Sequence, residues 1–131
     1  MKPVPRLPDL LAIAAGGALG SLLRSWIALG YEGSFPVPTL MVNLLGAGAL
    51  AVLYARRRRI RLRGRHLYMV GFCGSFTTVS LFSLETVQLI RSGSIVAGLG
   101  YAASSIWMAL LLVLVLVRCL EIPEEGKETE P

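Results

Sequence analysis

Charged side chains are nearly absent from four long apolar stretches of this chain. The first contains only Arg24, the third contains only Glu85, the second contains none, and the fourth contains none before Arg118. Each stretch has about 18 to 26 residues, and at about 1.5 Å per residue a helix of that length crosses a hydrocarbon core about 30 Å thick. We therefore predict an all-α membrane protein with four transmembrane helices, over residues 10–29, 38–55, 67–90 and 94–119.

The composition favours one membrane domain without a separate soluble domain. Hydrophobic residues make up 54% of the 131 residues and charged residues only 16%, which is unlike the balance of soluble domains. Residues 1–120 are expected to form the four-helix domain, and the acidic segment 121–131 is expected to be disordered. Cys73 and Cys119 lack metal-like spacing and are interpreted as packed apolar thiols. The first stretch has no signal-peptide cleavage site, so we interpret it as a helix.

Basic residues are concentrated on one side of the predicted bundle. An even number of spans puts both termini and the loop 55-ARRRRIRLRGRH-66 on the same side, which then holds 11 of the 13 Lys and Arg residues, all except Arg24 and Arg91. By the positive-inside rule, the termini and loop 55–66 face the cytoplasm. The arginines adjoin a membrane span, so we interpret them as a topology signal and an anionic-lipid contact and expect no nucleic-acid partner.

Several polar side chains lie inside the predicted spans, where an unpaired donor is costly and usually faces a cavity or a partner. Thr39 and Asn43 are four residues apart on one face of the second helix, and Tyr101 and Ser105 have the same spacing on the fourth. Arg24 is the only cation deep inside a span. We expect Asn43 and Arg24 in particular to have a function or an oligomer contact.

Glycine pairs predict close helix crossings. Gly16 and Gly20 form a GxxxG pair in the first span, and Gly46 and Gly48 lie close together in the second. Four short helices bury little protein surface among themselves, so we expect the chain to form an oligomer.

The segment 71-GFCGSFTTVSLFSLE-85 is unusually polar for a membrane span. Gly71, Gly74 and the hydroxyl residues from Ser75 to Thr78 are poor helix formers that compete for backbone hydrogen bonds, so we predict a break in the third helix near the bilayer centre. Carbonyls freed by a break are tolerated there only where they line a cavity, face protein or bind a cation. The positive edge of the Phe82 ring can face an anion.

Three motifs resemble the Fluc/CrcB family of small four-helix fluoride channels: 16-GGALGSLLR-24, 39-TLMVNLLG-46 and 71-GFCGSFTTVSLFSLE-85. They occur in the family's order over essentially the whole chain, and the third motif is the most specific. The resemblance implies passive export of cytoplasmic fluoride across the plasma membrane. It also implies an antiparallel, dual-topology dimer with two narrow pores.

The resemblance also assigns roles to individual residues. It implies a structural sodium ion at the dimer interface, held by the backbone carbonyls of Gly74 and Thr77. The family's ion pathway corresponds here to Arg24, Thr39, Asn43, Ser80, Phe82, Tyr101 and Ser105. Hydroxyl and amide donors along such a path can replace the water that a small anion loses on entry.

The chain departs from the family pattern TTFSTFS, because it reads 77-TTVSLFS-83. Val79 replaces a phenylalanine and Leu81 replaces a hydroxyl residue. The uneven distribution of Lys and Arg predicts one fixed orientation, so an antiparallel dimer would need a partner that inserts the other way. The alternative to a homodimeric channel is therefore a partner-dependent or non-conducting subunit of a heterodimeric fluoride channel.

Two further classes are weighed against the channel. A small multidrug transporter also has four helices, but it needs a membrane-embedded carboxylate in its substrate cavity, commonly in the first span. Here the first span has only Asp9 at its start, and the embedded acid is Glu85, in a motif that the channel family shares. An enzyme is not expected. The single histidine, His66, adjoins the arginine loop, and nothing in the sequence resembles a nucleophile, a base and an orienting group that converge in a pocket.

Overall fold

The computed structural model describes residues 6–120, and all regular structure in this range is helical. Four helical stretches are long and apolar enough to cross a membrane, at Leu7–Ala28, Val37–Ala55, Leu62–Arg91 and Ile95–Leu120. The prediction of an all-α protein with four such helices is confirmed, and the third begins earlier than the predicted residue 67. The segment 121–131, predicted to be disordered, lies outside the described residues.

Three of the four spans are single helices, and the third span is assembled from several pieces. The elements in order are α1 (Leu7–Ala28), α2 (Val37–Ala55), the 3-10 turn η1 (Arg57–Arg59), α3 (Leu62–Arg65), the π-helix η2 (His66–Cys73), α4 (Gly74–Phe76), α5 (Val79–Arg91) and α6 (Ile95–Leu120). The third span therefore consists of α3, η2, α4 and α5. The wide turn of η2 and the gap between α4 and α5 are irregularities of the kind that mark functional sites in membrane helices.

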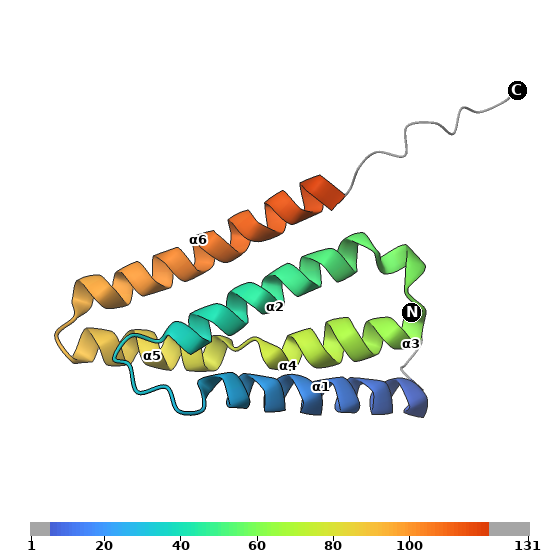
Figure 1. The fold of residues 1–131 in the computed structure, drawn as a ribbon, viewed down its shortest axis with the longest axis horizontal. Coiled ribbons are helices and arrows are strands. Elements are labelled where there is room, and N and C mark those ends of the chain that lie inside the picture. Colours follow the sequence, from blue (N-terminus) through green and yellow to red (C-terminus); the bar gives the residue numbers. More distant parts are fainter. Residues whose placement is uncertain (1–5, 121–131) are drawn as a thin grey trace, which may run out of the picture.

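Consecutive spans run in opposite directions along the bundle (Figure 1). Helix α1 lies along η2 and α4, while α6 packs against α2 and α5. The turn with η1 and α3 lies at one end of the bundle, beside the start of α1, and the connections 29–36 and 92–94 lie at the other end. Gly30 and Gly93 have positive φ angles of 77° and 88°, which explains why glycine stands at these two turns.

The close approach between α1 and η2 depends on glycine. A β-carbon at Gly16 would collide with the carbonyl oxygen of Leu67, and one at Gly20 would collide with the carbonyl oxygen of Phe72. A β-carbon at Gly71 would in turn meet the backbone of α1. Because the obstructing atoms are backbone, they cannot move aside as a side chain can. The GxxxG pair therefore forms a contact inside the chain, between the first and third spans.

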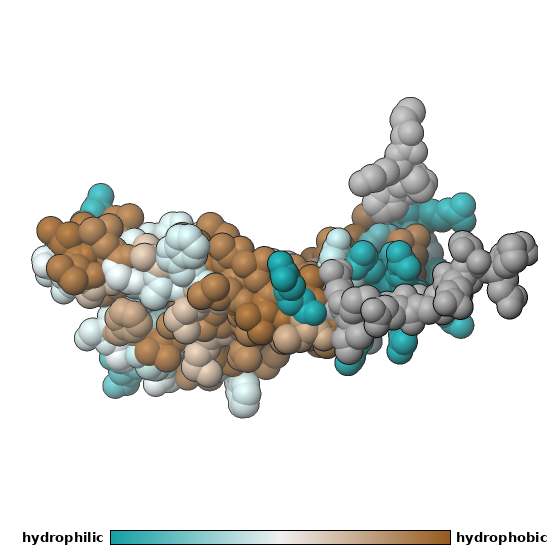
Figure 2. All heavy atoms as spheres, turned by 90° about the horizontal axis from the view of Figure 1, so that it is seen from above, coloured by the Kyte–Doolittle hydropathy of each residue, from teal (hydrophilic) through white to brown (hydrophobic). Residues whose placement is uncertain are grey.

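The face of the protein shown in Figure 2 is largely apolar. Large side chains remain exposed along the spans, among them Leu22 at 68% and Trp107 at 61%. Hydrophilic residues gather toward one end of the visible face. Such a surface fits lipid tails or a second protein. Within residues 6–120, the buried apolar residues are Val42, Ala51, Cys73, Phe76 and Tyr101.

Gly16→Ala is expected to destabilise the protein by about 1 to 3 kcal/mol, because the new methyl group forces two backbones apart. The matched control is Gly48→Ala, where the added methyl meets only flexible Leu112 and Leu116 side chains at 3.4 and 3.6 Å. Thermal unfolding of both variants in detergent, followed by size-exclusion chromatography, measures the difference. Equal unfolding midpoints for the two variants would contradict this account of the α1 and η2 contact.

Candidate functional site

The third span is interrupted at Thr77 and Thr78, which have extended backbone angles between α4 and α5. Thr77 has φ −80° and ψ 158°, and Thr78 has φ −148° and ψ 120°. The Thr78 hydroxyl then accepts a hydrogen bond from the Leu81 backbone N–H at 3.2 Å and so caps the start of α5. The interruption lies in the Gly- and hydroxyl-rich segment in which the sequence predicted a break.

Asn43 on α2 supplies the hydrogen bonds that the interrupted helix lacks. Its Nδ2 donates to the Thr78 carbonyl at 3.1 Å, and its Oδ1 accepts from the Thr78 N–H at 2.8 Å. One side-chain amide thus pairs with both polar groups of one residue, as a neighbouring strand would. Gly46, one turn further along α2, makes room for this contact, since a β-carbon there would collide with the Thr77 methyl group.

Because the N–H groups of Thr78 and Leu81 donate to side chains, the carbonyls of Gly74 and Thr77 lack the donors that a regular helix would give them. In an uninterrupted helix, the Thr78 N–H would donate to the Gly74 carbonyl and the Leu81 N–H to the Thr77 carbonyl. Here the first N–H donates to Asn43 and the second to the Thr78 hydroxyl. The carbonyls of Gly74 and Thr77 are the two that the sequence comparison with the channel family singled out for sodium.

Arg24 on α1 lies on the other side of the break. Its Nη1 is 3.5 Å from the Thr77 carbonyl oxygen, which is the upper limit of a hydrogen bond. The guanidinium thus brings positive charge to the break at membrane depth. A cation at the Thr77 carbonyl would have to share that oxygen with Arg24 or displace it.

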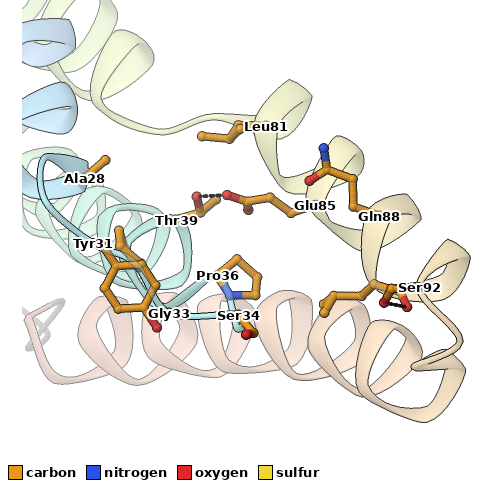
Figure 3. A pocket seen from close by; sticks show the side chains of 12 residues that line it. Ala28, Tyr31, Gly33, Ser34, Pro36, Thr39, Leu81, Glu85, Gln88 and Ser92 are labelled. Carbon is orange, nitrogen blue, oxygen red and sulfur yellow. Dashed lines mark hydrogen bonds between the residues drawn. The ribbon is translucent and has the colours of Figure 1, made fainter.

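A carboxylate joins two of the other predicted site residues. Glu85 on α5 accepts a hydrogen bond from the Thr39 hydroxyl at 2.7 Å and another from the Tyr101 hydroxyl at 3.0 Å, so each carboxylate oxygen has its own donor (Figure 3 shows the Thr39 bond). Thr39 and Tyr101 are almost completely buried, at 3% and 1% exposure. The Tyr101 ring also contacts Phe82, with a centroid distance of 5.3 Å, and the edge of Phe35 at 5.5 Å.

Sequence reasoning did not include Glu85 among the site residues. It treated this glutamate only as part of the motif in the third span. The sequence did offer one signal: Glu85 is the only charged residue of the predicted third span, and an ionisable group inside a membrane span must find partners. The partners themselves lie 46 and 16 residues away in the chain, so no local pattern identifies them.

Glu85 also lines a pocket of about 480 Å³ at the end of the bundle opposite to η1. The loop between α1 and α2 forms one wall, where the Tyr31 hydroxyl donates to the Phe35 carbonyl at 2.7 Å. Leu81, Gln88 and Ser92 of α5 and its C-terminal end form the facing wall (Figure 3). The pocket therefore leads from one end of the bundle to the Thr39 and Glu85 pair.

Ser80 and Ser105 are the remaining predicted site residues. Ser80 is exposed, and its hydroxyl is 3.3 Å from that of Thr78. Ser105 on α6 is buried, and its Oγ has no hydrogen-bond partner in the described part of the chain. The structure thus groups Thr39, Phe82 and Tyr101 around Glu85, groups Asn43 and Ser80 around Thr78, and leaves Arg24 and Ser105 outside both groups.

The donors within these two groups are neutral hydroxyls and the Asn43 amide, and the charged Arg24 lies beside them. In residues 6–120 no group of three His, Cys, Asp or Glu side chains could hold a metal ion.

These features define a small multi-pass membrane protein with polar groups held at bilayer depth between its helices. The family model described as CrcB-like protein, Camphor Resistance (CrcB), matches residues 11–117, and the chain belongs to this family.

Similar proteins from several bacteria carry one common name, "Fluoride-specific ion channel FluC". The protein from Pseudomonas fluorescens is 41% identical over 112 residues, covering 80% of this chain and 90% of the relative. The one from Leptospira interrogans is 43% identical over 120 residues, covering 76% and 93%. The one from Saccharophagus degradans is 35% identical over 125 residues, covering 91% and 94%.

Asn43→Leu is expected to destabilise the protein, because it leaves the N–H and the carbonyl of Thr78 without partners at a cost of about 1 to 3 kcal/mol each. Asn43→Asp keeps the acceptor, loses the donor and buries a carboxyl group, so it is also expected to destabilise the protein. Thermal unfolding and hydrogen exchange of a peptide containing Thr78 measure both. The matched control is Gln88→Leu, which removes an exposed amide from α5. Unchanged exchange and stability in Asn43→Leu would contradict the assigned pairing.

Proposed function

We propose that the chain forms a fluoride-selective channel that exports cytoplasmic fluoride passively and so lowers its toxicity. The observation that carries the proposal is the identity of 35% to 43% with proteins named fluoride-specific ion channels, over most of both chains. Hydrogen fluoride enters cells as a neutral weak acid and dissociates in the less acidic cytoplasm, so the anion accumulates. A selective channel then suffices for its removal, and no catalytic group or energy source is required.

The proposed ion path follows the hydrogen-bond donors between the pocket and the break. Thr39 and Glu85 line the inner end of the pocket, and the Tyr101 hydroxyl lies behind them on Glu85. The proposed path continues past Phe82 to Ser80 and Asn43. The Asn43 amide has two hydrogens, of which Thr78 takes one, so the second can donate to an anion. Successive donors replace the water of a small, strongly hydrated ion step by step.

Two further residues complete the proposed path. The buried Ser105 hydroxyl has no partner within residues 6–120 and can donate to a passing ion. Arg24 supplies positive potential at membrane depth, which attracts anions in general, so selection has to come from the donors and from the width of the path.

A sodium ion at the Gly74 and Thr77 carbonyls is proposed as a structural element of the channel. Both carbonyls have lost the helical donors they would have in a continuous helix, and oxygen dipoles without donors favour a cation. Gly74 is exposed on the surface of the single chain, and nothing lies within 4 Å of a β-carbon built there. The remaining ligands would then come from a second subunit that covers this surface.

The partner is proposed to be a second subunit of the same family in antiparallel orientation. Val79, next to the break, is 78% exposed in the single chain, and exposed apolar side chains continue along the spans. An antiparallel copy or homologue would cover this surface. We place the assembly in the plasma membrane, with both termini and loop 55–66 in the cytoplasm, because 11 of 13 basic residues lie on that side.

A partner-dependent or non-conducting subunit is the second candidate. Val79 and Leu81 stand where the family pattern has an aromatic ring and a hydroxyl, and Leu81 instead forms part of the pocket wall. The uneven charge distribution points in the same direction, since a homodimer of antiparallel chains needs insertion in both orientations.

Fluoride efflux from liposomes tests the channel directly. Liposomes containing this chain, alone or with a homologue encoded beside its gene, are expected to release fluoride and retain chloride. Tyr101→Phe is expected to slow efflux about tenfold, because it removes a hydroxyl donor worth about 1.4 kcal/mol. Tyr68→Phe is the matched control, since Tyr68 is 49% exposed near the opposite end of the bundle.

The composition of the liposomes separates the two candidates, and the buffer tests the sodium proposal. Efflux by this chain alone supports the homodimer, and efflux only from the mixture supports the partner-dependent subunit. No fluoride efflux from either would refute the proposed function.

Replacement of sodium by a large organic cation during purification is expected to lower both efflux and thermal stability, and an unchanged stability would refute the sodium site.

The orientation of the chain is tested in cells with reporters fused after residue 131. A fluorescent protein is expected to give signal and alkaline phosphatase is expected to be inactive, because the basic side stays in the cytoplasm. Replacing Arg58, Arg59, Arg61 and Arg63 by Gln should allow insertion in both directions. Comparable activity of both reporters on the unmodified chain would contradict a fixed orientation and remove the charge argument for a heterodimer.

A further inference from the structure

The connection between α2 and η2 is the most highly charged part of the described chain. Seven arginines occur between Arg56 and Arg65, and this connection lies at one end of the bundle (Figure 1). Two of them fold back onto the connection itself: the Arg57 guanidinium lies 4.0 Å above the Tyr54 ring and donates to the Tyr54 carbonyl, and Arg65 donates to the Ile60 carbonyl at 3.0 Å. These contacts give the connection a defined shape.

The other five arginines are exposed and have no compensating charge within residues 6–120. Arg56, Arg58, Arg59, Arg61 and Arg63 are exposed, and no carboxylate within residues 6–120 forms an ion pair with them. Asp9 at the same end is already in contact with the Arg6 N–H and, at 3.4 Å, with His66. Glu32 and Glu85 belong to the opposite half of the bundle. The five positive charges therefore repel one another unless an anion lies among them.

Apolar and aromatic side chains around these arginines indicate how deep the arginines lie in the membrane. Tyr54 at the end of α2 and Tyr68 in η2 are 46% and 49% exposed, as expected for tyrosines at the boundary between lipid tails and water. Leu62, between two arginines, is 61% exposed. An outward-facing leucine among guanidinium groups fits the headgroup layer, where lipid tails and phosphates meet.

We propose that Arg58, Arg59, Arg61 and Arg63 form a binding surface for the phosphate groups of anionic phospholipids. The guanidinium group presents paired donors that match phosphate oxygens bidentately, and clusters of basic residues directly beside a membrane span bind anionic headgroups. Bound lipid relieves the repulsion among the arginines and stabilises the connection between the second and third spans. This surface is separate from the Thr78 and Glu85 groups, so it does not depend on the proposed ion path.

The test uses the full chain in nanodiscs of phosphatidylcholine with increasing fractions of phosphatidylglycerol. Phosphatidylglycerol is expected to raise the thermal unfolding midpoint and to be retained with the protein by mass spectrometry. Replacing the four arginines by Gln is expected to weaken the apparent lipid affinity about fivefold for each residue. The matched control Arg91→Gln removes one positive charge from the opposite end and should leave the lipid response unchanged. Both leaflets of a nanodisc are accessible, so the direction of insertion does not affect the measurement.

Several results would overturn the proposal. These are an equal response to phosphatidylcholine and phosphatidylglycerol, a full response in the four-residue Gln variant, or the same stabilisation by inorganic phosphate at matched ionic strength. A response that appears only after Glu124, Glu125, Glu128 and Glu130 are replaced by Gln would assign the arginines to the acidic segment of the chain instead. If the Gln variant does not fold, the corresponding Lys variant decides: a reduced lipid affinity supports bidentate phosphate binding, and an unchanged affinity overturns it.

Discussion

A peptide group that leaves a helix inside a bilayer must find another hydrogen-bond partner, and in this chain Asn43 supplies it for Thr78. The two bonds, at 2.8 and 3.1 Å, satisfy a donor and an acceptor that no water can reach in the hydrocarbon core. They allow α4 to end and α5 to begin in mid-membrane. Without them, the N–H and the carbonyl of Thr78 would be left without partners inside the span.

The position of α5 after the break determines what its side chains reach. Glu85 comes within hydrogen-bond distance of Thr39 on α2 and Tyr101 on α6, so one carboxylate links three spans. Both carboxylate oxygens accept a hydroxyl donor, so this charged group is not left without partners inside the span. The break, the carboxylate and the pocket therefore form one arrangement.

The glycine contacts between α1 and η2 serve the same arrangement from the other side. They bring α1 close enough for Arg24 to approach the Thr77 carbonyl, at 3.5 Å. Meanwhile the outward-facing leucine, valine and tryptophan side chains leave large apolar faces for lipid or for a second subunit. The interior of the single chain is thus organised by polar and backbone contacts, and its exterior by the apolar solvent of the membrane.

The sequence by itself determined the four spans, because stretches without charge and about 20 residues long have few alternatives to a membrane helix. It also located the break, because Gly74, Thr77 and Thr78 disfavour a helix locally, and its motifs indicated the family. Only the tertiary structure decided that Asn43 pairs with Thr78, 35 residues away, and that Glu85 pairs with Thr39, 46 residues away. Helical periodicity fixes the face on which a side chain lies, but the packing of separate helices fixes which partner it meets.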